Sequence, residues 1–160
     1  MKYQHQFKVN APLEQVAQFH SRSQSMANIT PPPLKVEVHQ APVQLAEGDE
    51  MDFTLRAGPI SIHWLARIEN VGPNGFTDRQ LSGPFCHWRH RHNFKVINPT
   101  TTAVIDEIEF SLRPHPWWGL LGLGMALTLP FLFAYRGWRT RQLFNATAKS
   151  NKDWENNYVR

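Results

Sequence analysis

Alternating apolar and polar positions recur from the N-terminus to about residue 110 and predict a series of β-strands. In one clear example, Ile62, Trp64 and Ile68 fall on one face, and His63 and Arg67 fall on the other. The predicted strands cover residues 3–9, 34–39, 51–55, 60–69, 76–80, 83–94 and 104–110. Turn-forming residues at 57–59, 72–75 and 98–100 separate consecutive strands. Such short connections predict an antiparallel meander.

A helical period replaces the alternation directly after the first strand. Asn10 is a capping candidate, and Pro12 suits an early helical position. The inward-facing positions predicted for this helix are Leu13, Val16, Ala17 and Phe19 or His20. A second short helix is predicted within residues 21–29, and the prolines at 31–33 end it because proline cannot continue a helix. Two short helices are therefore expected after the first strand.

The C-terminal part of the chain, from about Trp117 to Lys149, is predicted to be one long helix. Leu127, Phe131, Tyr135 and Trp138 form one apolar helical stripe. Three arginines are expected near the solvent-facing side of this helix: Arg136, Arg139 and Arg141. The last residues, 151–160, are polar and are expected to fray.

This order of elements favours an α+β fold in one domain covering residues 1–160. A curved antiparallel sheet of about seven strands, wrapped around the long C-terminal helix, buries the apolar faces most simply. This arrangement is the helix-grip. The gap between the sheet and the helix is then the natural place for a ligand cavity.

The stretch Gly83–Phe94 carries the most unusual pattern in the chain. On a strand, Cys86, Trp88, His90, His92 and Phe94 share one face, whereas His87, Arg89, Arg91 and Asn93 share the solvent-facing side. An aromatic face with two histidines is typical of a cavity wall that carries a few placed polar groups. The candidate ligand-binding residues are Trp64, Phe76, Trp88, His90, His92, Phe94, Phe110, Phe131 and Tyr135. The alternative for each aromatic residue is a place in the ordinary core.

His90 and His92 lie two residues apart, so both imidazoles point to the same side of the predicted strand. Across the turn at 98–100, Asp106 is expected opposite His92, and a register on the other side brings Asp78 near His90. One interpretation is a polar network that orients a ligand. Another is acid/base catalysis, with His90, His92 and Asp106 as candidates. A transition metal would need a third ligand from Asp106, Asp78 or Cys86; because two histidines supply only half a site, no resident metal or cofactor is predicted.

Composition narrows the possible partners. The formal net charge is +4, and the basic residues form no long run, which argues against a nucleic-acid partner. Cys86 is the only cysteine. An internal disulfide is thereby excluded, which suits a cytoplasmic location, and we expect an inert buried thiol. No phosphate-binding loop or Ser-His-Asp arrangement is found.

One segment raises the question of a membrane. Residues Pro116–Tyr135 contain no charged side chain, and about twenty such residues can span a bilayer. The same segment lies where the helix gripped by the sheet is expected, so we favour the gripped helix. Peripheral membrane contact through Trp117–Tyr135 is the alternative.

Several of these segments resemble the START-like, polyketide cyclase/dehydrase superfamily. The similar stretches are residues 16–20, Ile29-Thr30-Pro31-Pro32, residues 76–94, which include the Trp-x-His-x-His-x-Phe string at 88–94, and residues 102–106. The resemblance implies a helix-grip fold with a hydrophobic cavity, but it does not imply one chemistry. Similar domains also occur fused to sugar-nucleotide epimerase domains.

Three functions follow as hypotheses from the residues and this resemblance. The first is binding or carrying a hydrophobic or amphipathic small molecule, either lipid-like or polyketide-like. The second is a cyclase/dehydratase-type reaction that uses the cavity histidines. The third is regulation at a membrane.

Overall fold

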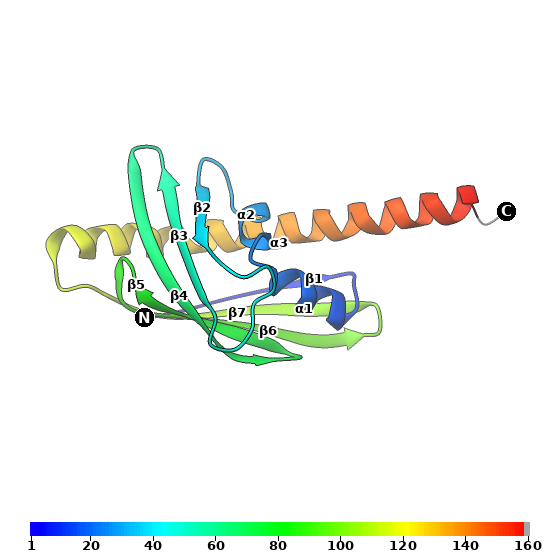
Figure 1. Ribbon diagram of the computed structural model, residues 1–160, viewed down its shortest axis with the longest axis horizontal. Coiled ribbons are helices and arrows are strands. Elements are labelled where there is room, and N and C mark those ends of the chain that lie inside the picture. Colours follow the sequence, from blue (N-terminus) through cyan, green and yellow to red (C-terminus); the bar gives the residue numbers. More distant parts are fainter. Residues whose placement is uncertain (159–160) are drawn as a thin grey trace.

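The computed structural model describes the backbone of residues 1–158 and the side chains of residues 1–147. Within residues 1–158, seven strands form one antiparallel sheet in the order β1-β7-β6-β5-β4-β3-β2, and three helices accompany it. The bounds are β1 Lys2–Val9, α1 Leu13–His20, α2 Ser25–Asn28, β2 Lys35–Gln40, β3 Glu50–Ala57, β4 Ile60–Gly72, β5 Gly75–Ser82, β6 Phe85–Asn98, β7 Thr101–Leu112 and α3 Pro116–Tyr158. The predicted fold class is confirmed: a curved antiparallel sheet grips one long C-terminal helix (Figure 1).

The sheet is a meander from β2 to β7, and β1 pairs with β7 at the far edge. The predicted pairings in its centre are confirmed, because Asp106 on β7 stands opposite His92 and Asp78 on β5 stands opposite His90. One position on β6 differs from the prediction. The register shifts between Phe85 and His87, so Cys86 sits in a bulge and is exposed rather than buried.

α3 packs on the concave face of the sheet through a stripe that the sequence analysis did not select. Leu129 and Phe133 are buried in the core. Gly137 lies so close to the sheet that an added Cβ would be 3.0 Å from the ring of Phe7. A helix that presents its smallest residues to the sheet can approach it closely, and this contact fixes which side of α3 faces inward.

The predicted apolar stripe of α3 is largely solvent-facing, which corrects the sequence analysis. Leu127 is 69% exposed, Phe131 is 80% exposed, and Trp138 is also exposed. Arg136 was expected near the solvent-facing side of the helix, but it is half-buried and lines the interior cavity. An almost uniformly apolar helix carries more than one possible inward face, and only its packing partner selects among them.

The element ends differ slightly from the sequence expectation. Pro12, without a side-chain capping hydrogen bond, is the N-cap residue of α1, so Asn10 does not cap it. α3 continues to Tyr158, past its predicted end near Lys149, and its last part extends beyond the sheet (Figure 1). Residues 159–160 of the expected frayed tail lie outside the described residues.

Candidate functional site

A cavity of about 980 Å³ lies between the concave face of the sheet and α3. This volume is at the upper end of the range typical of small-molecule sites. Most of its wall is apolar and comes from β3, β4, the α2 region and α3. Representative lining residues are Met26, Ile29, Phe53, Leu55, Ile62, Met125, Leu129 and Leu132. The wall is therefore suited to an apolar guest.

Seven of the nine residues predicted to contact a ligand line this cavity. They are Trp64, Phe76, Trp88, His90, His92, Phe131 and Tyr135. Phe94 instead lines a smaller cavity on the side of α1, and Phe110 packs in the core, with its ring 5.5 Å from that of Phe85. The structure thus places Phe94 and Phe110 away from the main cavity. Whether the other seven contact a ligand stays a prediction.

Four titratable side chains form a closed cluster at one part of the cavity wall. His90 Nε2 lies 3.0 Å from Asp106 Oδ1, and His90 Nδ1 lies 3.3 Å from Asp78 Oδ2. His92 faces the same two carboxylates, with Nδ1 3.1 Å from Asp106 Oδ1 and Nε2 3.8 Å from Asp78 Oδ2. Each carboxylate therefore faces both imidazoles. The alternation of β6 produces this arrangement by placing the two rings side by side, with centroids 3.9 Å apart.

This cluster shifts the pKa values of its members in opposite directions. Burial alone lowers the pKa of His90, but its hydrogen bonds and charge interactions with Asp106 and Asp78 outweigh burial and raise it to about 9. Burial raises the pKa of each aspartate, yet the two histidines more than offset this and hold both carboxyl pKa values well below their usual range. At neutral pH the cluster therefore contains an imidazolium between two carboxylates.

His92 is the member of the cluster with spare hydrogen-bonding capacity. Its ring stacks on Phe76, with centroids 4.5 Å apart. Although Nδ1 is near Asp106, its direction is not that of a hydrogen bond, so this buried nitrogen has no hydrogen-bond partner. His90, by contrast, directs both ring nitrogens at carboxylates. Of the predicted catalytic candidates, His90 and His92 line the cavity and Asp106 does not.

Three members of the cluster are also placed to ligate a metal. Asp78, His90 and His92 each offer one ligand atom, and these atoms lie within 4.8 Å of one another. Ligands of a tetrahedral zinc ion, bound at about 2.0–2.1 Å, lie roughly 3.3 Å apart. Of the third ligands considered from the sequence, Asp78 completes the set, whereas Cys86 is exposed in its bulge.

Two further polar residues on the cavity wall were not among the predicted site residues. His20 on α1 hydrogen-bonds the carbonyl of Val16 through Nδ1 at 2.8 Å, so Nδ1 donates and Nε2 is left as an acceptor. Burial, followed by the charge of His92, lowers the pKa of His20 to about 4. Arg136 on α3 also lines the wall. The helical spacing of α1 signalled the inward position of His20, but nothing in the spacing of α3 singled out Arg136.

Comparison with solved structures supports the fold. A nucleoside-diphosphate sugar epimerase from Corynebacterium glutamicum is 24% identical, with a TM-score of 0.68, over 94% of this chain but only 30% of its own. An aromatase/cyclase from a Streptomyces species is 18% identical, with a TM-score of 0.64, over 89% of this chain and 95% of its own. A START superfamily protein from Mycobacterium smegmatis is 14% identical, with a TM-score of 0.62, over 89% of this chain and 98% of its own.

The chain has the START-like helix-grip fold. This confirms the fold that the sequence resemblance implied. Structural similarity at such low sequence identity shows a shared fold and does not identify the chemistry. No family model matches the sequence, and no curated protein matches it.

Proposed function

We propose that this protein binds an apolar or amphipathic small molecule in the cavity between the sheet and α3. The observation that carries this proposal is a cavity of about 980 Å³ whose wall is apolar over most of its extent. Atoms that line an open space lack packing partners on one side, so an apolar guest that fills the space gains those contacts. The aromatase/cyclase and START neighbours have the same fold, which supports a ligand-binding role.

A cavity-filling variant tests this proposal with little disturbance of the core. Leu55 on β3 is half-buried and lines the cavity, so Leu55→Trp should occupy part of the space. Leu81→Trp is the matched control, because Leu81 on β5 is exposed and does not line the cavity. We expect Leu55→Trp to weaken binding of an uncharged naphthylamine fluorescent probe at least about tenfold, while Leu81→Trp has no effect. Equal binding by both variants, or no probe binding by the wild type, contradicts the proposal.

A catalytic role of the cyclase/dehydratase type would use the same cavity. It would require a histidine that reaches the guest, and His92 and His20 are better placed than His90, which is occupied by its two carboxylates. The positions of His92 and His20 do not identify a reaction. We therefore keep binding as the main function.

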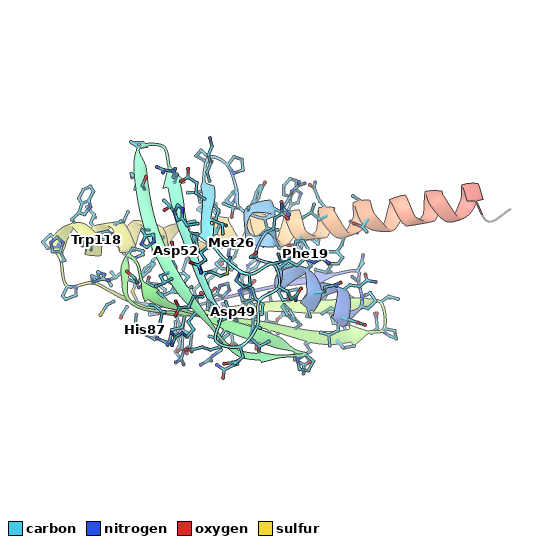
Figure 2. All side chains as sticks on the ribbon, in the orientation of Figure 1. Phe19, Met26, Asp49, Asp52, His87 and Trp118 are labelled. Carbon is cyan, nitrogen blue, oxygen red and sulfur yellow. The ribbon has the colours of Figure 1, made fainter. Side chains whose placement is uncertain are left out.

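A second candidate function is contact with a membrane surface. Residues Pro116–Thr147 of α3 are long and apolar enough to cross a bilayer, and only 17% of the most apolar 18-residue window is buried. Trp117 is 65% exposed, and Figure 2 shows its neighbour Trp118 at the N-terminal end of α3. One side of α3 packs on the sheet and the other side is exposed. We therefore propose that α3 lies on a bilayer surface with its exposed side and does not cross the bilayer.

Anionic lipid is the surface we expect. The net charge is +4, the residues from Pro116 to Tyr135 include no acidic side chain, and Arg139 and Arg141 follow on the same helix. Replacing Leu123 and Leu127 together by Gln should reduce co-sedimentation with vesicles containing phosphatidylglycerol several-fold, because both side chains are exposed. Val43→Gln, an exposed apolar position outside α3, is the control. Unchanged sedimentation of the double variant contradicts lipid contact through α3.

A further inference from the structure

The charged groups on the cavity wall are not all paired. Asp78 and Asp106 interact with His90 and His92 at distances of 3.0–3.8 Å. Arg136 lines the same cavity, and its Nε is buried without a hydrogen-bond partner. Among the residues whose side chains are described, no carboxylate forms a salt bridge with its guanidinium. The cavity wall thus carries a buried Nε–H of Arg136 that no described carboxylate accepts.

Two arginines on the outer surface of the sheet do have carboxylate partners. Arg67 is 2.6 Å from Glu50, and Arg79 is 2.7 Å from Glu69. An exposed arginine is solvated even without a partner, whereas one that faces an apolar space loses much of its hydration. Arg89 on β6 also has a buried Nε without a hydrogen-bond partner, but Arg136 is the one of these two that lines the cavity.

The surroundings of Arg136 compensate its charge only in part. The guanidinium carbon lies 5.2 Å from the centre of the Phe133 ring, which is a cation–π distance. Burial lowers the pKa of Arg136, and the more distant charges of Asp106 and Asp78 only partly oppose this. Those two carboxylates contact His90 and His92 and form no salt bridge with Arg136. An anion in the cavity would accept a hydrogen bond from the buried Nε–H of Arg136.

Arg136 is also held at a defined place on the wall. It follows Phe133 on α3, and the Phe133 ring packs edge-on against His90 at 5.3 Å, so the arginine lies on the side of the cavity that carries the polar cluster. The wall away from this cluster is formed by apolar side chains such as Leu55 and Ile62. A guest that matches both parts has one charged end and an apolar body.

We propose that Arg136 binds the carboxylate end of an amphipathic ligand, such as a long-chain carboxylic acid, whose apolar body fills the cavity. The planar guanidinium suits a carboxylate because it can donate two parallel hydrogen bonds. This inference rests on the proposed ligand-binding function and adds the class of ligand to it. It does not depend on membrane contact.

A pair of probes that differ only in the head group separates this inference from the parent proposal. Dodecanoic acid and dodecanol have the same chain, so displacement of an uncharged fluorescent probe by each reports the effect of the carboxylate. The wild type is expected to bind the acid at least about tenfold more tightly than the alcohol. If both bind equally, the cavity function stands and the role of Arg136 is overturned. If neither binds, the proposed function and this inference fail together.

Variants assign the preference to Arg136. Arg136→Gln should bind dodecanol as the wild type does and lose the preference for the acid, whereas Arg136→Lys should retain part of it. Arg139→Gln is the matched control, because Arg139 lies one turn later, bonds Gln142 and does not line the cavity. Retained alcohol binding shows that the Gln variant is folded. A full acid preference in Arg136→Gln overturns the inference. An equal loss of that preference in the control Arg139→Gln overturns it too.

Discussion

Asp106 stands directly opposite His92 in the β6–β7 register, yet its carboxylate accepts its hydrogen bond from His90, two residues away, at 3.0 Å. The two rings share one face of β6, so one buried carboxylate reaches both. On β5, Asp78 is nearer to His90, which stands directly opposite it, at 3.3 Å, than to the diagonal His92 at 3.8 Å. The cluster therefore joins three adjacent strands beneath the cavity and should govern how stability depends on pH.

Stability should fall as the pH rises above neutrality because of His90. Its pKa is about 9 in the folded protein and 6.5 in the unfolded chain. Its contribution to the free energy of unfolding is therefore complete below pH 6.5 and is lost as the pH rises through 9. The groups facing it are Asp78, Asp106, His92 and, from α3, Arg136. We expect a loss of at most roughly 3 kcal/mol in the free energy of unfolding, measured by urea titration.

The comparison with His90→Asn isolates this effect. The variant should be less stable at pH 6.5 and should show a much flatter dependence between pH 6.5 and 9. Parallel curves for the two proteins would mean that the alkaline loss arises elsewhere in the molecule.

Stability should also fall on the acid side, for a different reason. Burial lowers the pKa of His20 to about 4, so the unfolded chain binds a proton between pH 6.5 and 4 that the folded protein does not. The free energy of unfolding should therefore decrease as the pH falls through this window. His20→Gln should reduce the slope, as judged by urea titration at pH 6.5, 5.5 and 4.5. A slope that the substitution leaves unchanged would contradict the buried, neutral state of His20.

Two glycines of α3 should respond oppositely to the same substitution. A Cβ at Gly137 would meet the ring of Phe7 at 3.0 Å, whereas one at Gly124 meets nothing within 4 Å. Gly124→Leu should be neutral or stabilising by up to about 1 kcal/mol through helix propensity. Gly137→Leu should destabilise by about 1–3 kcal/mol through overpacking. Chemical denaturation checks both, and equal effects would show that α3 does not pack closely at Gly137.

The cluster should hold no stoichiometric metal after purification without a tag. Although Asp78, His90 and His92 are close enough to ligate, a protonated His90 between two carboxylates already neutralises much of the negative charge, and a metal must displace that proton. Elemental analysis by mass spectrometry checks this. One zinc ion per chain, lost in the His90→Ala and His92→Ala variant, would show that the cluster is a metal centre.

Cys86 should react in the native protein. The bulge between Phe85 and His87 leaves its side chain exposed, and Figure 2 shows the adjacent His87 on the side of the sheet away from α3. A disulfide reagent should titrate one thiol per chain without denaturant, and none in Cys86→Ser. A thiol that reacts only in urea would return Cys86 to the buried position expected from alternation.

Local periodicity was sufficient to predict those features that lie within one strand or one hairpin. Alternation gave the strands, and the turn between β6 and β7 placed Asp106 opposite His92, because pairing across a short turn leaves few registers. The cavity-facing aromatic residues Trp64 and Trp88 followed from the same alternation.

The tertiary structure alone decided what depends on a partner element. Pattern and length predict that α3 is a helix, but its apolar residues cover nearly its whole circumference, so periodicity could not choose its inward face. Contact with Phe7 selects the face that contains Gly137, which turns Leu127 outward and brings Arg136 to the cavity. The bulge at Cys86 likewise depends on pairing with β7. Period-two and helical patterns specify faces within one element, whereas the choice between competing faces is made by the packing energy of two elements together.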